Sequence, residues 1–136
     1  MKDYNEPCVS LDTATMLQAI GFNWPGYACY DNLGVKGRLY YTFGCLDHNH
    51  HKHCGELISA PTLAFAQKYI RETFNIHITI YSSSQESWMY RITEKGQKLE
   101  DGLYGEDFYT YEEAQEEAIK QVLKNKIQNE TGERIE

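Results

Sequence analysis

The densest group of potential metal ligands lies in the segment CLDHNHHKHC, residues 45–54. Four of the chain's five histidines lie there, between two of its four cysteines. Cys45, His48, His51 and Cys54 follow a C-x2-H-x2-H-x2-C spacing, and gaps of two residues let neighbouring side chains converge on one ion. Thiolate and imidazole are the ligands that Zn²⁺ takes in tetrahedral sites. These four residues are the candidate metal site, and zinc is the cofactor that they would bind.

The same segment has a second interpretation, a polar solvated loop. Structural zinc sites usually place a longer segment between their two ligand pairs, and His50 and His53 are competing ligands here. Matches to a short ligand motif also carry a high false-positive rate. The sequence therefore favours a loop without a native cofactor, and zinc binding is the alternative.

The other reactive residues do not form a recognisable catalytic group. Cys45 and Cys54 have histidines nearby in the chain, but neither lies at a strand-to-helix turn of the kind that exposes a nucleophile. The acidic residues at 100–107 lack the regular spacing of a calcium-binding loop. The glycines of GVKG, residues 34–37, lack the spacing of a phosphate-binding loop. The sequence therefore favours a protein that is not an enzyme.

Charge and hydropathy argue against two classes of partner. The chain has 20 Asp and Glu against 13 Lys and Arg, a net charge of −7, whereas affinity for nucleic acid comes mostly from Lys and Arg. No segment is long and apolar enough to be a membrane span or the core of a secretory signal. We therefore expect a cytoplasmic protein with reduced cysteines and no membrane partner.

Aromatic residues indicate a contact surface. The chain has 11 tyrosines, and tyrosine combines an apolar ring with a polar tip that suits half-buried strands and interfaces. The candidate contact residues are clustered in residues 24–41, and part of the set is expected to lie in the core. They are Trp24, Tyr27, Tyr30, Tyr40 and Tyr41.

The first part of the chain predicts a helix and a hairpin. Ser10 can cap a helix that ends near Gly21. The aromatic stretch that follows is divided by glycines, which predicts two hairpin strands over residues 27–31 and 38–43. The histidine-rich segment comes next. We expect residues 1–58 to form this N-terminal part.

The second part has stronger signals. Apolar residues at helical spacing predict a helix over residues 59–75, with Pro61 in its first turn. Strict alternation then predicts two strands, over residues 76–81 and 87–93. A weaker strand is expected within residues 98–104, interrupted by glycine.

The last helix has the clearest beginning. Thr110 and Glu113 have the spacing of a capping box, and Tyr109 can pack against Ala114. The pattern ends near residue 127, and residues 128–136 are predicted to be a disordered tail. The fold class is therefore α+β, an antiparallel three-stranded sheet packed against two helices (α-β-β-β-α) over residues 59–127, with an N-terminal helix and hairpin extension.

Two families share features with this chain. The element order from Pro61 to Ile127 resembles the double-stranded-RNA-binding domain. That family binds phosphates through lysines at the start of its last helix, where this chain has four glutamates. The resemblance therefore implies a shared topology without RNA binding. The glutamates are Glu112, Glu113, Glu116 and Glu117.

The second resemblance lies in three blocks, VSLDTATMLQAIGF, APTLAFAQKYIRETFNIHI and TYEEAQEEAIKQVL. They are similar to small proteins of unknown function that are encoded by phages, prophages and mobile elements of Bacteroides-type bacteria. The first block is also similar to the opening helix of excisionase-like DNA-binding proteins, but the basic second helix of that family does not follow. These resemblances imply a mobile-element origin without assigning a site.

Together, these observations predict a small cytosolic, non-enzymatic protein that acts through contact with a partner protein or with itself. A zinc-binding protein is the first alternative. A nucleic-acid-binding accessory protein is the second.

Overall fold

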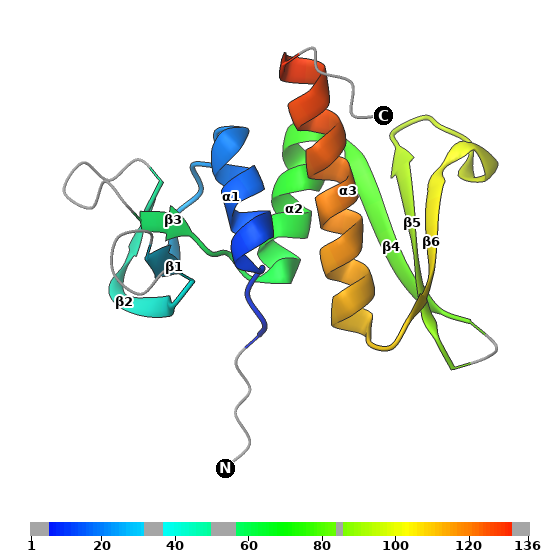
Figure 1. The fold of residues 1–136 in the computed structure, drawn as a ribbon. Coiled ribbons are helices and arrows are strands. Elements are labelled where there is room, and N and C mark those ends of the chain that lie inside the picture. Colours follow the sequence, from blue (N-terminus) through cyan, green and yellow to red (C-terminus); the bar gives the residue numbers. More distant parts are fainter. Residues whose placement is uncertain (1–5, 32–36, 50–56, 84–85, 132–136) are drawn as a thin grey trace.

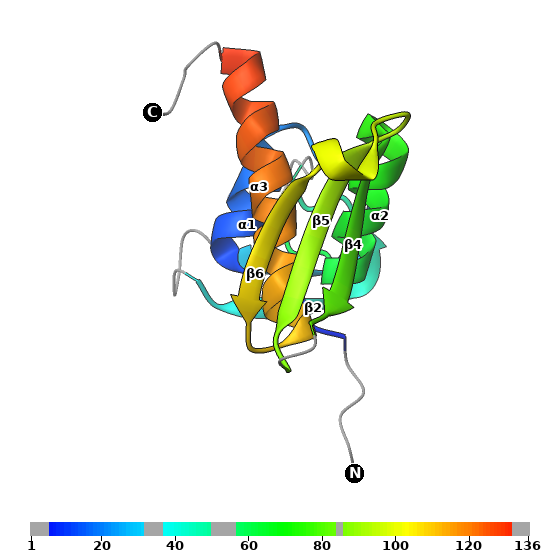
Figure 2. The ribbon, with the colours of Figure 1, turned by 90° about the vertical axis from the view of Figure 1, so that its right-hand side faces the viewer.

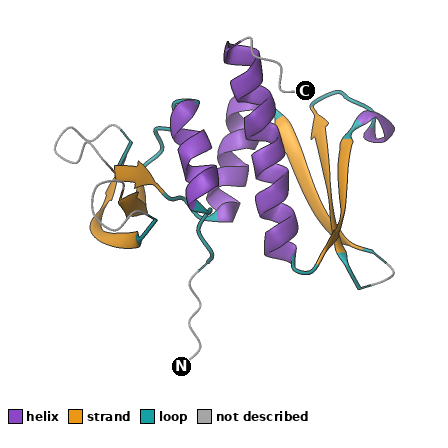
Figure 3. Ribbon diagram, viewed as in Figure 1, coloured by secondary structure: helices purple, strands orange, loops and turns teal. Residues whose placement is uncertain are grey.

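The structure is a computed structural model that describes residues 6–31, 37–49, 57–83 and 86–131; for residues 43–46, 130 and 131 it describes the backbone only. Within these ranges, three α-helices lie between two antiparallel sheets (Figures 1 and 3). The elements follow the order α1 (Leu11–Ala19), β1 (Gly26–Asp31), β2 (Leu39–Leu46), β3 (Leu57–Ser59), α2 (Leu63–Phe74), β4 (Ile76–Ser82), β5 (Trp88–Glu94), a 3₁₀ turn η1 (Leu99–Asp101), β6 (Leu103–Phe108) and α3 (Tyr111–Thr131).

The predicted α-β-β-β-α unit is confirmed. Its sheet has the order β4-β5-β6, and α2 and α3 cover one face of it (Figure 2). The pairing of β4 with β5 is continuous, from Ile76 opposite Glu94 to Ser82 opposite Trp88. Because side chains alternate along a strand, Ile78 and its partner Ile92 both face the helices and are buried.

The N-terminal helix and hairpin are also confirmed, but the hairpin belongs to a larger sheet. β1 pairs with β2 on one side and with the short strand β3 on the other. The prediction that residues 59–75 form a helix with Pro61 in its first turn is wrong at its start. Ser59 pairs with β1, and the helix begins only after Thr62, whose side chain accepts a hydrogen bond from Phe65 N. This long-range pairing prevails over the local helical pattern.

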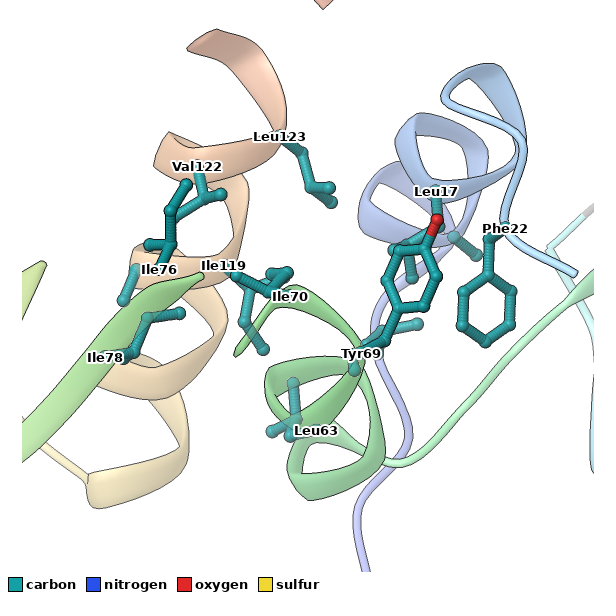
Figure 4. Packing of buried hydrophobic residues seen from close by; sticks show 14 of the residues in the cluster. Leu17, Phe22, Leu63, Tyr69, Ile70, Ile76, Ile78, Ile119, Val122 and Leu123 are labelled. Carbon is teal, nitrogen blue, oxygen red and sulfur yellow. The ribbon is translucent and has the colours of Figure 1, made fainter. Parts of the chain in front are cut away.

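One core joins the two parts of the chain. Its buried side chains come from α1, α2, α3 and the inner face of the β4-β5-β6 sheet (Figure 4). Leu17 and Phe22 pack on the side of Tyr69, while Ile119 and Val122 lie toward β4. The residues of segments 1–58 and 59–127 thus contribute to the same hydrophobic cluster.

The last strand lies later than expected. β6 runs from Leu103 to Phe108 rather than within residues 98–104, and Gly105 does not interrupt it. Gly105 is the cross-strand partner of Tyr90, and the tyrosine ring occupies the space that a Cβ would need. Glycine at this position therefore allows the aromatic ring to cover the strand.

The start of α3 has the predicted cap. Glu113 N donates to Thr110 Oγ1 at 3.0 Å, and Tyr109 N donates to Glu113 Oε2 at 3.1 Å. Tyr109 does not pack against Ala114, because its side chain is 90% exposed. The predicted tail is too long, since α3 continues through residues 128–131. Among the described helices, none has the length and apolar character needed to span a membrane.

Candidate functional site

A largely apolar pocket lies where the N-terminal segment, the β1-β2 pair and the start of α2 meet. Its volume is about 510 Å³, which is in the range of pockets that bind small molecules or partner side chains. Glu6 is the one charged residue among the described lining residues. The lining consists of Glu6, Cys8, Pro25, Gly26, Tyr27, Ala28, Tyr41, Ala60, Pro61, Thr62 and Phe65.

Backbone hydrogen bonds hold the N-terminal wall of this pocket in place. Leu63 N donates to Pro7 O at 3.0 Å, and Val9 N donates to Pro61 O at 2.9 Å. Between these bonds, Cys8 forms an antiparallel bridge with Thr62. The chain before α1 is therefore anchored across the start of α2, and Cys8 is fixed at the pocket.

Two exposed tyrosines form the opposite wall. Tyr27 is 59% exposed and Tyr41 is 63% exposed, which is unusual for large aromatic side chains. Tyr41 is the cross-strand partner of Ala28, and the register between β1 and β2 shifts between Gly26 and Ala28. Such an irregularity redirects side chains at the edge of a sheet. The pocket is therefore bordered by two aromatic rings that reach solvent.

Phe65 lines the pocket from α2. Its ring packs edge-on against Trp24 with centroids 5.2 Å apart, and Trp24 packs in the same way against Tyr69. Trp24 therefore contacts a lining residue of the pocket without lining the pocket itself. Edge-to-face packing of this kind adds to the stability that comes from apolar burial.

Cys8 is the nucleophilic group in the pocket. Burial raises the pKa of its thiol, and a side-chain hydrogen bond with Tyr41 lowers that pKa in part. A raised pKa keeps the sulfur protonated near neutral pH, and the thiol is a weak nucleophile.

The structure separates the five predicted contact residues. Tyr27 and Tyr41 line the pocket, and Trp24 packs against the lining residue Phe65. Tyr30 donates a hydrogen bond from its hydroxyl to Val9 O at 2.6 Å, and burial raises the pKa of that hydroxyl. Tyr40 pairs with Cys29, so it faces the side of the sheet opposite to Tyr41, and Arg38 lies 5.0 Å from the centre of its ring.

Sequence analysis did not identify Cys8, Pro25, Pro61 or Phe65 as pocket residues. Phe65 lies beside the buried stripe of α2, a position where a large aromatic side chain is partly exposed. A large aromatic residue beside the buried face of a predicted helix was the one sequence signal for this part of the pocket. The approach of Cys8 to Thr62 joins residues that are far apart in the chain, and no local pattern predicts it.

The structure describes only part of the predicted metal site. His48 is buried, with 2% of its surface exposed, and its Nε2 lies 3.0 Å from Gly26 O. For Cys45 the backbone alone is described, and His51 and Cys54 lie outside the described residues. Within the described ranges, no three His, Cys, Asp or Glu side chains are grouped as metal ligands would be.

The structure also describes two cysteines, one histidine and one tryptophan that the sequence analysis considered. Neither Cys8 nor Cys29 forms a disulfide. His77 is exposed on the outer face of β4. Trp88 faces the helices and packs edge-on against Tyr111, with centroids 5.4 Å apart.

Comparison with known proteins gives no further assignment. No protein-family model matches this chain, and no curated protein or solved structure is significantly similar to it. The mobile-element origin and the likeness to the double-stranded-RNA-binding domain therefore stay predictions.

Proposed function

We propose that this chain is a non-enzymatic contact protein, and that the pocket between Tyr27, Tyr41 and Phe65 receives an apolar side chain of a partner protein. The observation that carries the proposal is the pairing of an apolar pocket of about 510 Å³ with two solvent-exposed tyrosines at its border. Tyrosine rings and apolar pockets are the features that dominate the energy of protein interfaces.

The test is site-specific photo-crosslinking in the cell of origin. A benzophenone amino acid replaces Tyr41 at the pocket or, as the matched control, Tyr104 of β6, which is 46% exposed and is not among the pocket's lining residues. We expect a discrete protein adduct from position 41 and none from position 104. An adduct with a second copy of the chain would identify self-association as the contact. Equal labelling at both positions, or no adduct at position 41, would contradict the proposal.

We propose zinc binding by Cys45, His48, His51 and Cys54 as a second function. The observation that favours it is the position of His48 Nε2 at 3.0 Å from the Gly26 carbonyl oxygen. Because a carbonyl oxygen can only accept, Nε2 donates this hydrogen bond, and Nδ1 is the nitrogen that a metal ion would use. An imidazole held through one nitrogen by a backbone carbonyl is typical of metal-binding histidines.

Native mass spectrometry of untagged protein, purified without a metal column, tests this second proposal. Stoichiometric zinc that is lost when Cys45 and Cys54 are both replaced by serine would support it. Metal-free protein, from cells grown with adequate zinc, would contradict it and leave the contact function unaffected.

A further inference from the structure

A second hollow adjoins the apolar pocket. Its volume is about 530 Å³, and Cys8 lines both spaces. Its apolar part is formed by Pro7, Leu63 and Phe108, and four glutamates of the first turns of α3 border it. One short segment of a partner protein can therefore reach both hollows across Cys8.

The charge of this surface has one sign. The glutamates of the second hollow are Glu112, Glu113, Glu116 and Glu117, and Glu6 adds a further carboxylate at the first pocket. Among the described residues that line the two hollows, none is basic. A partner that buried further acidic groups here would meet repulsion from every side, whereas a basic one would be attracted.

Three of these glutamates already have partners within the fold. Glu113 accepts from Tyr109 N, and Glu116 accepts from Ser10 N and Thr13 Oγ1. Glu117 accepts from Gln121 Nε2. Glu112 is exposed and lines the second hollow as well as a smaller one beside it. Glu112 is therefore the residue whose charge can be changed with the least effect on the fold.

The apolar lining of the second hollow favours basic side chains over metal ions. A small hydrated metal ion gains nothing from Pro7, Leu63 and Phe108. Lysine and arginine have aliphatic stems that pack on apolar surface while the charged end reaches a carboxylate. The hollow therefore fits basic side chains.

We infer that the partner at this surface is a basic protein segment, with an aromatic or aliphatic side chain that enters the apolar pocket and Lys or Arg side chains that lie over the second hollow. The inference rests on the proposed contact function and specifies the chemistry of the partner. Acidic or uncharged segments with the same anchor would bind more weakly.

The experiment is selection from a random peptide library displayed on mRNA, using the purified full chain as bait and counter-selecting on Tyr41→Ala. Circular dichroism verifies that the variant is folded, and Tyr27→Ala provides a second counter-selection. Affinities of the recovered peptides are then measured by fluorescence anisotropy for wild type, Glu112→Lys and Glu72→Lys. The last variant is the matched control, because Glu72 is exposed on α2 and is not among the residues that line either hollow.

We expect the selected peptides to combine an apolar anchor with Lys or Arg, and to bind Glu112→Lys about three- to tenfold more weakly than wild type. Glu72→Lys should bind as wild type does. Peptides that depend on Tyr41 but lack basic residues would overturn the inference and leave the contact function standing. An equal loss with Glu72→Lys would also overturn it, since net charge alone would then explain the preference. Absence of any peptide that depends on Tyr41 or Tyr27 would overturn this inference and the proposed contact function.

Discussion

Glu116 of α3 completes the N-terminal cap of α1 by accepting a hydrogen bond from Ser10 N at 2.9 Å. The same carboxylate oxygen accepts from Thr13 Oγ1 at 2.6 Å. In a local capping box, a glutamate or glutamine three residues after the cap would bind this backbone N–H. Thr13 occupies that position here, and the distant Glu116 supplies the acceptor instead.

Replacing Glu116 by alanine should lower the free energy of unfolding by about 2 kcal/mol, because two hydrogen bonds to a charged acceptor are lost. Urea denaturation measures the change. Glu117→Ala is the matched control, since the hydrogen bond that Glu117 accepts comes from Gln121 on its own helix. We expect a cost below about 0.5 kcal/mol for this half-buried pair one turn apart on α3. Equal costs for the two variants would show that the cap of α1 contributes little.

Gly105→Ala should destabilise the β4-β5-β6 sheet by about 1 to 3 kcal/mol, as is typical of overpacking. A Cβ at this position would lie 2.1 Å from Tyr90 Cε2 in the present arrangement. Gly26→Ala is the control, because a Cβ there meets nothing within 4 Å. Thermal unfolding of both variants measures the difference, and a neutral Gly105→Ala would mean that the Tyr90 ring moves aside at no cost.

Stability should fall as the pH rises above about 10, the ordinary pKa of tyrosine. Burial first, and then the charge of Glu117, raise the pKa of Tyr90 in the folded state. The unfolded chain therefore releases this proton at lower pH than the folded chain, so the contribution is complete below about 10 and declines above it. Urea denaturation between pH 8 and 11 tests this, and Tyr90→Phe should show a shallower decline. An identical decline in both proteins would assign the effect to other groups.

Cys8 should react with iodoacetamide more slowly than a free cysteine, because burial raises the pKa of its thiol. Tyr41→Phe removes the hydrogen bond that lowers this pKa, so the pH of half-maximal rate should rise further. Peptide mapping by mass spectrometry follows Cys8 separately from the other cysteines. A rate that is unchanged by Tyr41→Phe would show that the hydroxyl does not affect the thiol. Peptides that occupy the pocket should protect Cys8 in the same assay.

The features that sequence predicted well depend on neighbours in the chain. Strict alternation at residues 76–81 and 87–93 specified β4 and β5, and the spacing of Thr110 and Glu113 specified the start of α3. Each of these signals is complete within a few residues, so it can be interpreted without knowledge of the fold.

The features that sequence did not predict depend on distant partners. β3 exists because Ile58 and Ser59 pair with β1, and Gly105 remains within a strand because Tyr90 covers it. Residue type and clustering within residues 24–41 indicate the candidate tyrosines, but neither shows which of them line a pocket. Which of them lie at the pocket depends on the register shift between Gly26 and Ala28. Amino-acid composition does not predict such a shift.

The cap that Glu116 provides to α1 also has a consequence for the order of folding during synthesis. The residues that it joins, Ser10 and Glu116, are 106 positions apart. The ribosome completes α1 long before it adds the acceptor for the Ser10 amide, so the first helix emerges with an unfinished end. Ribosome-bound chains that stop short of α3 should therefore exchange the α1 amide hydrogens freely, and protection should arise when α3 leaves the exit tunnel. The helix α1 is made early, but its folding is thus expected to be completed only after α3 has been made.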